Sequence, residues 1–209
     1  MSIAGRQTAF NFPSRGGKRK GAGRRRTRPH PGLIGPGVPH LKRPDFASRH
    51  PVHVTMRLQP GVGYLRSYQR AKVVKDALRA ARERFGVRII HDSIQGNHLH
   101  LIVEAEGPEA LSRALQGLAT RLARRLNKLS GRRGAVFADR YHSHPLRTPR
   151  EAKHAVRYVL ANYRHHALEY LPAGWTDALA SSRFVQERPG LDAPVVAPSV
   201  WLLRVGWRL

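Results

Sequence analysis

Alternating apolar and polar positions predict a chain of short strands separated by amphipathic helices. The segment PVHVTMRL, residues 51–58, places an apolar residue at every second position, which is typical of a strand with one buried face. Together with turn residues and helical spacing elsewhere, the pattern predicts strands at 51–58, 87–95, 98–105 and 135–146 and helices at 64–85, 108–130 and 149–166. The first six elements follow the order of the ferredoxin-like split βαβ sandwich, an α+β fold.

The third predicted strand, HLHLIVEA at 98–105, is central in that topology, together with the first strand. Side chains alternate between the two faces of a strand. We therefore expect the apolar residues Leu99, Leu101 and Val103 to face the helices that cover the sheet. His98 and His100 then lie together on the opposite face.

The predicted helix at 149–166 has a well-specified start and a polar stripe. Thr148 and Glu151 form a capping box around Pro149, a favoured first helical residue, so Glu151 is interpreted as a cap. A ferredoxin-like sheet leaves one face uncovered, and this helix is available to cover it. Its polar stripe beside the apolar side would then approach the two histidines; the stripe consists of Glu151, His154, Tyr158, Asn162 and His165.

These residue types can carry phosphoryl chemistry. Two imidazoles on one strand face, His98 and His100, can bind one divalent metal, and the amide oxygen of Asn162 is a hard ligand suited to Mg²⁺ or Mn²⁺. The phenol of Tyr158, one helical turn away, is a nucleophile toward phosphorus that would form a phosphotyrosine link. Taken singly, each residue has a simpler interpretation: structural histidines, a packing tyrosine, an ordinary helix asparagine.

Charge strengthens the phosphoryl interpretation. The 209 residues include 38 Lys and Arg against 13 Asp and Glu, a net charge of +25, which favours a polyanionic partner. Nucleic acid is the leading candidate and an anionic membrane surface the weaker one. The absence of cysteine excludes disulfide scaffolds, thiolate catalysis and Cys-based metal sites. Without a membrane-spanning or secretory segment, we expect a cytoplasmic, nucleoid-associated protein with no membrane partner.

The composition divides the chain into three parts. Residues 1–50 hold 12 Lys and Arg, one acid, 8 Gly and 6 Pro, which predicts a disordered basic arm. Residues 51–166 would form the catalytic domain, and residues 167–209 an extension that packs on it. A merely solubilising tail is the alternative for the arm. Its candidate DNA-binding residues are Lys18, Arg19, Lys20, Arg24, Arg25 and Arg26.

A second basic surface follows one face of the predicted helix at 108–130. It would grip a sugar–phosphate backbone, and the alternative is an ordinary solvated face. Three tryptophans, Trp175, Trp201 and Trp207, are candidates either for base stacking or for internal packing. The candidate DNA-binding residues are Arg113, Arg121, Arg124, Arg125 and Lys128, with Arg140 on the last predicted strand.

Two segments carry a family resemblance. GNHLHLIVEA, residues 96–105, resembles the His–hydrophobic–His motif of HUH endonucleases. VFADRYHSHPLRTPREAKHAVRYVLANYRHH, residues 136–166, resembles the nucleophile helix of single-tyrosine transposases. Within these the chain is most similar to REP-associated tyrosine transposases, relatives of insertion sequence 200-like enzymes. The tyrosine follows the histidine pair, unlike in relaxases, and Asn162 stands where rolling-circle initiators usually carry lysine.

The resemblance implies roles for individual residues. His98, His100 and Asn162 would bind the metal, and Tyr158 would attack single-stranded DNA next to a hairpin. The family forms a 5′-phosphotyrosine and a free 3′-hydroxyl and then rejoins strands. One departure is the turn before the first histidine, which reads Gln95-Gly96-Asn97 instead of Met-Pro-Asn.

Other assignments stay open in the sequence. Tyr141, Tyr163 and Tyr170 are rival nucleophiles, although neither Tyr141 nor Tyr163 has an amide four residues later. A non-catalytic or domesticated nucleic-acid-binding protein and a metal-dependent phosphodiesterase without a covalent step are the alternative functions. The sequence does not choose between a monomer and a homodimer.

Overall fold

The computed structural model describes residues 45–167, 175–185 and 187–209. Several candidates named above lie outside the described residues: the arm residues Lys18, Arg19, Lys20, Arg24, Arg25 and Arg26, and the rival nucleophile Tyr170. Among the described residues, no helix is long and apolar enough to cross a membrane.

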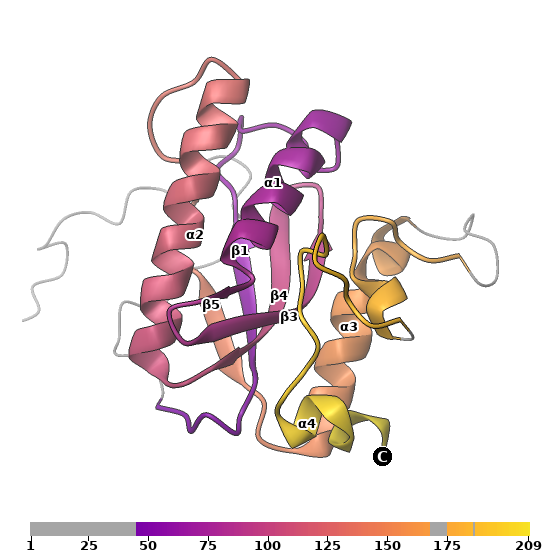
Figure 1. The fold of residues 1–209 in the computed structure, drawn as a ribbon. Coiled ribbons are helices and arrows are strands. Elements are labelled where there is room, and N and C mark those ends of the chain that lie inside the picture. Colours follow the sequence, from indigo (N-terminus) through magenta and orange to yellow (C-terminus); the bar gives the residue numbers. More distant parts are fainter. Residues whose placement is uncertain (1–44, 168–174, 186) are drawn as a thin grey trace, which may run out of the picture.

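The centre of the fold is an antiparallel sheet in the order β2-β3-β4-β1-β5. As expected for a ferredoxin-like sandwich, β1 and β4 are adjacent in the middle (Figure 1). The histidine-bearing strand therefore has a neighbour on each side. The strands are β1 (Val52–Arg57), β2 (Glu83–Arg84), β3 (Val87–Ile94), β4 (His98–Ala105) and β5 (His142–Pro145).

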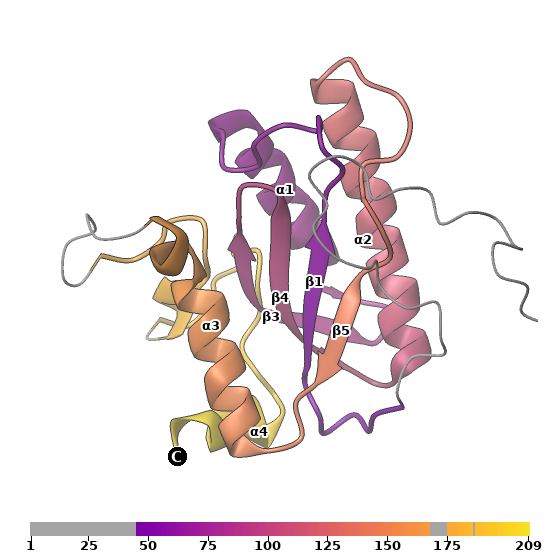
Figure 2. The same cartoon turned by 180° about the vertical axis from the view of Figure 1, so that it is seen from behind.

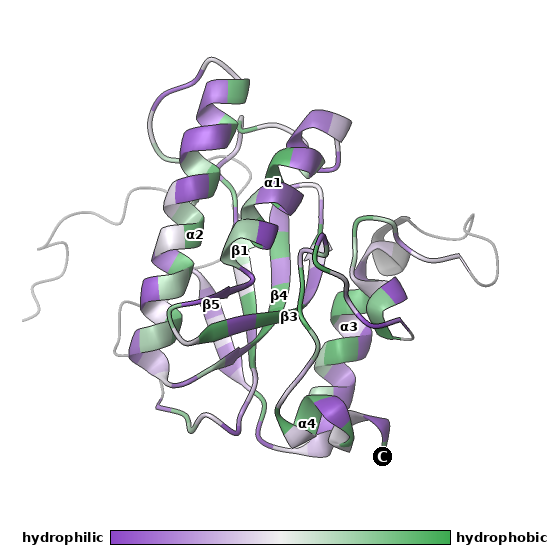
Figure 3. Cartoon of the chain, viewed as in Figure 1, coloured by the Kyte–Doolittle hydropathy of each residue, from purple (hydrophilic) through white to green (hydrophobic). Residues whose placement is uncertain are grey.

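Two long helices cover one face of this sheet, namely α1 (Tyr68–Ala81) and α2 (Pro108–Leu129). The main hydrophobic core lies between them and the inward side chains of the strands. Along α2 and α3, hydrophobic and hydrophilic segments alternate, as expected for amphipathic helices (Figure 3). The buried leucines of α2 are Leu111, Leu115, Leu118, Leu122 and Leu126. Leu129, which the helical spacing places on the same side, is 36% exposed at the end of the helix.

A third helix, α3 (Pro149–Ala167), lies on the other face beside β3 and β4. Val156 and Val159 of α3 pack with Ile102 of β4 and Leu203 of the C-terminal segment in a second, smaller core. Seen from this side, no described helix covers β1 and β5 (Figure 2). The sheet thus keeps an open strip next to α3.

The C-terminal residues pack against α3 and the sheet edge. Glu104 of β4 accepts hydrogen bonds from the backbone N–H groups of Ser199 and Val200, just before the short helix α4 (Trp201–Arg204). Lys153 of α3 donates to the carbonyl of Leu209 at 2.7 Å. Two 3₁₀ turns complete the described elements, η2 (Ser182–Val185) and η3 (Gly206–Arg208).

Two predicted elements are longer in the sequence pattern than in the structure. The helix predicted at 64–85 begins only at Tyr68, after a loop that is fastened to the Gly96 turn by the N–H of Leu65. It ends at Ala81, because Glu83 and Arg84 pair with β3 and the chain then turns at positive φ through Phe85 and Gly86. The strand predicted at 135–146 is reduced to β5. Phe137 and Ala138 do pair with the end of β1, but Asp139 bonds the next backbone N–H and interrupts the ladder.

Candidate active site

His98 and His100 project from β4 toward the side of the sheet where α3 lies. Their Nε2 atoms are 3.0 Å apart and the rings are nearly perpendicular, with centroids 4.7 Å apart. His100 is buried, whereas His98 is half-buried. The alternation of β4 therefore brings the pair together as the sequence predicted.

The remaining ring nitrogens have oxygen or nitrogen partners that orient the pair. Nδ1 of His98 lies 2.8 Å from the side-chain oxygen of Asn97, which only accepts hydrogen bonds, so this nitrogen carries the proton. Nδ1 of His100 lies 3.1 Å from Oγ1 of Thr55 and 3.2 Å from Nε2 of His53. With the protons on Nδ1, both Nε2 atoms keep a lone pair, and at 3.0 Å they are close enough to bind one cation together.

Helix α3 brings Tyr158 and Asn162 to the same place, one turn apart. The Tyr158 ring stands edge-on to His100, with centroids 5.1 Å apart, and 44% of Tyr158 is exposed. Asn162 is fully buried, and its Nδ2 lies 3.5 Å from Nε2 of His100. The Oδ1 atom of Asn162 has no hydrogen-bond partner.

A divalent metal fits this donor set. Within the described residues there is no group of three or more His, Cys, Asp or Glu side chains that could hold a metal. A third protein ligand must therefore be of another type. The buried Oδ1 of Asn162 could supply one, because it has no hydrogen-bond partner, a buried carbonyl oxygen without a partner is costly, and a cation would satisfy it. Two imidazoles and one amide leave further coordination positions for phosphate oxygens.

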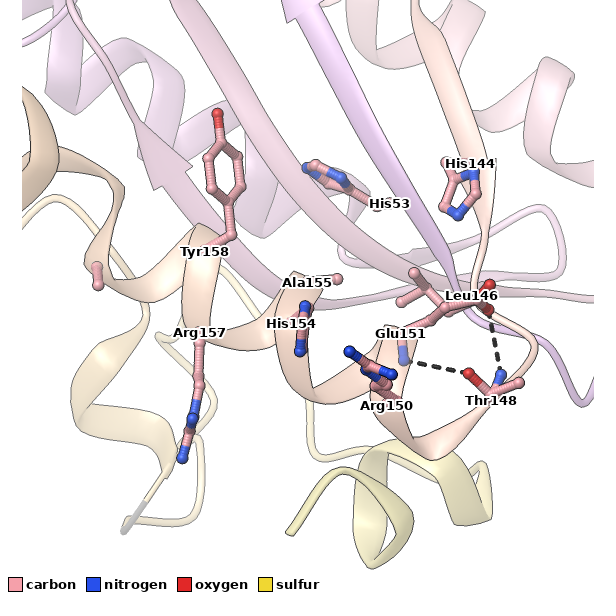
Figure 4. Close-up of a pocket in the computed structure, with 11 residues that line it drawn as sticks. His53, His144, Leu146, Thr148, Arg150, Glu151, His154, Ala155, Arg157 and Tyr158 are labelled. Atoms are coloured by element: carbon pink, nitrogen blue, oxygen red, sulfur yellow. Dashed lines mark hydrogen bonds between the residues drawn. The ribbon is translucent and has the colours of Figure 1, made fainter. Parts of the chain in front are cut away.

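An open pocket of about 980 Å³ adjoins the tyrosine on the uncovered strip of the sheet. Figure 4 shows its lining, with Tyr158 and His154 projecting from α3 and His53 and His144 from the sheet. Arg150 and Arg157 of α3 also line the pocket, and the Arg157 side chain runs away from Tyr158 in Figure 4. The pocket is thus rich in groups that bind anions.

The acidic group of the pocket, Glu151, caps the helix, as predicted. Its carboxylate accepts hydrogen bonds from the N–H groups of Arg147, at 2.6 Å, and Thr148. The N–H of Glu151 in turn donates to Oγ1 of Thr148. The Arg147 hydrogen bond above all lowers the pKa of Glu151, so the carboxylate is held at the helix start and away from the histidine pair.

His53 belongs to the site and was missed by the sequence reasoning. It lies on β1 opposite His144 of β5, contacts His100 and stands edge-on to Tyr158 with centroids 5.9 Å apart. Burial, followed by His142 and His144, lowers the pKa of His53 to about 4, so it is neutral near pH 7. The signal was present, since alternation in VHVTMR places His53 on the polar face of β1.

The rival tyrosines lie elsewhere. Tyr141 packs against the main core, between the sheet and its two helices. Tyr163 is half-buried. The guanidinium of Arg66 lies 3.5 Å from its ring centroid, and the ring centroid of Trp175 lies 5.8 Å away. Trp207 packs against the smaller core, whereas Trp201 is 53% exposed.

The basic face of α2 lies on the opposite side of the sheet from the histidine pair. Four of its candidate residues are exposed and Arg121 is half-buried; the exposed ones are Arg113, Arg124, Arg125 and Lys128. Arg140, also half-buried, precedes β5 at the sheet edge. The structure therefore separates this basic surface from the candidate active site.

Comparison with known proteins finds a family and solved structures of similar fold. The family model described as "Transposase IS200 like" matches residues 47–162, more than half of the chain. A solved structure described as "Structure of the REP associates tyrosine transposase bound to a REP hairpin" superposes with a TM-score of 0.57 at 18% identity, covering 78% of this chain and 93% of that one. At that identity the superposition shows a shared fold. No curated protein matches the sequence.

Proposed function

The chain belongs to the IS200-like transposase family, and on that premise we propose that it cuts and rejoins single-stranded DNA beside a hairpin, with Tyr158 as the nucleophile. The observation that carries the proposal is the position of the exposed Tyr158 ring, 5.1 Å from His100 and on the edge of an open basic pocket. Binding alone would need neither a pair of imidazoles nor a buried amide oxygen without a hydrogen-bond partner.

In the proposed cleavage, the Oη atom of Tyr158 attacks a backbone phosphorus. A bond forms between Oη and phosphorus, the bond from phosphorus to the 3′-oxygen breaks, and the phenol proton is lost to solvent while the leaving oxygen becomes a 3′-hydroxyl. The resulting 5′-phosphotyrosine retains the phosphodiester energy. Attack by a second 3′-hydroxyl reverses the step, joins the strands and releases Tyr158.

His98, His100 and Asn162 would hold a divalent metal, Mg²⁺ or Mn²⁺, in this reaction. When bound, such an ion neutralises charge on the non-bridging phosphate oxygens. The protein residues supply the rest: Thr55 and His53 orient His100, and Asn97 orients His98. Arg150, Arg157 and His154 line the pocket on the α3 side, where they would bind neighbouring phosphates.

We also propose a DNA hairpin as the partner. The solved relative is described as bound to a REP hairpin, and this chain has a net charge of +25. A stem needs sequence-independent backbone contacts, which exposed arginines provide. The candidates are Arg113, Arg121, Arg124, Arg125, Lys128 and Arg140, with Lys18, Arg19, Lys20, Arg24, Arg25 and Arg26 of the arm.

The test is covalent capture of DNA. End-labelled hairpin oligonucleotides with single-stranded flanks, taken from the flanks of the protein's own gene, are incubated with protein and Mn²⁺ or Mg²⁺ and run on a denaturing gel. We expect a protein–DNA adduct with the wild type, and none with Tyr158→Phe, which lacks the attacking oxygen. His98→Ala should also lose the adduct, and chelator should abolish it in the wild type.

Tyr163→Phe is the matched control, because Tyr163 lies on the same helix but stacks under Arg66. It should form the adduct like the wild type. Hairpin binding on a native gel without any adduct, over several hairpins and both metals, would refute the proposal and favour a non-catalytic DNA-binding protein.

A further inference from the structure

The loop between β1 and α1 holds one exposed aromatic side chain beside the turn that leads into the histidine strand. Val62 and Leu65 of this loop are buried, at 2% and 0% exposure, whereas Tyr64 between them is 56% exposed. The N–H of Leu65 donates to the carbonyl of Gly96 at 2.8 Å, which fastens the loop to the turn. Tyr64 is therefore exposed on a loop whose neighbouring residues are fixed.

A salt bridge fastens the same loop to the C-terminal segment. Arg66 donates two hydrogen bonds of 2.8 Å to the carboxylate of Asp177 and a third to the carbonyl of Ile94. Both side chains of the pair are buried, at 9% and 2% exposure. The guanidinium also covers the ring of Tyr163 on α3. Fixed on both sides, Tyr64 would lose little conformational freedom on binding a ligand.

The Tyr64 ring packs against Gly96, where a larger residue would leave no room for it. A Cβ atom on Gly96 would lie 2.7 Å from Cε2 and 3.1 Å from Cδ2 of Tyr64, closer than side chains tolerate. Gly96 is not among the described glycines with positive φ, so its backbone conformation does not demand glycine. Space for the tyrosine is what the missing side chain provides. The contact is made by one edge of the ring, and more than half of Tyr64 stays exposed.

The surroundings of Tyr64 suit a nucleic-acid strand. Asn97, next to Gly96, bonds His98, and Arg57 stands opposite His98 in the β1–β4 ladder and is exposed. Exposed aromatic rings and exposed cations are the groups with which proteins bind unpaired bases and the backbone between them. The basic pocket reaches Tyr158 from the other side, through His53 and the first turns of α3.

We infer that Tyr64 is a stacking site for an unpaired nucleobase of the single strand that runs from the basic pocket past Tyr158 toward His98. This inference rests on the proposed function, because it takes single-stranded DNA as the substrate. It also accounts for the departure of Gln95-Gly96-Asn97 from Met-Pro-Asn: a proline at position 96 would place ring atoms where the edge of Tyr64 now lies.

The experiment measures stacking without cleavage. Full-length Tyr158→Phe protein is titrated into hairpin DNA that carries the fluorescent base 2-aminopurine at each single-stranded position in turn. We expect quenching at one or two adjacent positions, and its loss when Tyr64→Ala is added, with about tenfold weaker binding. Tyr64→Phe should retain both the quenching and the affinity, because its ring still stacks.

Tyr68→Ala is the matched control, since Tyr68 is an exposed tyrosine four residues away on α1, with 84% exposure. Tyr68→Ala should show the same quenching and the same affinity as the parent protein. An abasic nucleotide at the quenched position should weaken binding as much as Tyr64→Ala does, and combining the two should cost nothing more. Urea unfolding of Tyr64→Ala should match the parent, because the side chain is exposed.

Unchanged quenching and an affinity within twofold in Tyr64→Ala would overturn the inference. The proposed function is tested separately, by the covalent-capture assay with protein that retains Tyr158. An adduct without Tyr64-dependent quenching refutes only the stacking site. Tyr64-dependent quenching without an adduct supports the stacking site and refutes strand transfer.

Discussion

His100 is the side chain on which the contacts of the candidate site converge. Its Nε2 lies 3.0 Å from Nε2 of His98 and 3.5 Å from Nδ2 of Asn162, and its ring adjoins Tyr158. Its Nδ1 faces His53 and Thr55. Any group that changes the orientation or protonation of His100 would therefore affect the proposed metal site and Tyr158 together.

Replacing His53 should weaken metal binding without unfolding the protein. His53→Ala removes one of the two partners of Nδ1 of His100, and loss of such an outer partner typically costs about 10- to 100-fold in metal affinity. Mn²⁺ binding, followed by electron paramagnetic resonance on protein without DNA, gives the dissociation constant. His50→Ala, before β1, should bind like the wild type, and equal affinity in His53→Ala would argue against a positioning role.

Two buried titratable neighbours on β3, His91 and Asp92, have opposite effects on stability. Burial raises the pKa of Asp92 from 3.8 to about 7, so between these values the folded state binds the extra proton and stability falls as pH rises. Burial lowers the pKa of His91 from 6.5 to about 4, so there the unfolded state binds the extra proton and stability rises with pH. In the wild type the two trends partly cancel.

Asp92→Asn should remove one of these trends and reveal the other. With Asn at this position, we expect stability to fall more steeply than in the wild type as the pH is lowered from 6.5 to 4.5. Above pH 7 the variant should be the more stable protein, because no carboxylate has to be charged in the core. Urea unfolding at pH 4.5, 5.5, 6.5 and 7.5 tests both parts, and parallel curves for the two proteins would contradict the assignment.

Helix α3 carries both the proposed nucleophile and the third proposed metal ligand. The four-residue spacing of Tyr158 and Asn162 places them on one face, and Val156 and Val159 set that face against the sheet by packing in the smaller core. The capping box at Thr148 and Glu151 fixes where the helix begins. The site thus depends on one helix end and one apolar stripe.

Thr148→Ala tests the contribution of that cap. It removes the hydroxyl that accepts the N–H of Glu151, and loss of such a cap costs about 1 kcal/mol, or roughly 2–4 °C in Tm for a chain of this size. Thermal unfolding gives the change. Thr148→Ser, which keeps the hydroxyl, should stay near the wild type, and no difference between the two variants would show that the cap is dispensable.

In the whole molecule, the two faces of the sheet have different partners. One face carries α1 and α2 over the main core, with the basic surface of α2 outside, and the other carries α3, the histidine pair and the open pocket. If α2 binds a hairpin stem, its charges should contribute to affinity and not to the cleavage step.

Removing positive charge from α2 should weaken binding to all DNA sequences by about the same factor. We expect a triple variant, in which Gln replaces Arg124, Arg125 and Lys128, to bind DNA with a weaker salt dependence. The slope of log K against log[salt] should become shallower by roughly 0.7–0.9 for each phosphate that the variant no longer neutralises. Single-turnover adduct formation at saturating DNA should stay near the wild-type rate. Lys72→Gln on α1, which removes one charge paired with Asp76, should change affinity less than Arg124→Gln. An equal loss of affinity in Lys72→Gln and Arg124→Gln would show that net charge alone, and not the α2 surface, determines binding.

Much of this arrangement follows from local patterns in the sequence. Period-two alternation determined that His98 and His100 share a face, and a 100° turn per residue determined that Tyr158 and Asn162 share a stripe. The capping box determined the start of α3. These features depend only on backbone geometry repeated over a few residues, which is why they hold without knowledge of what packs nearby.

The tertiary structure decided what lies between segments that are distant in the chain. The pairing of β1 with β4 and β5 places His53 against His100, and the fastening of the 58–67 loop to the 95–97 turn places Tyr64 over Gly96. The interruption at Asp139 likewise depends on where β1 ends. Strand register and loop packing are set by contacts across the sheet and through the core, and the composition of one segment does not contain them.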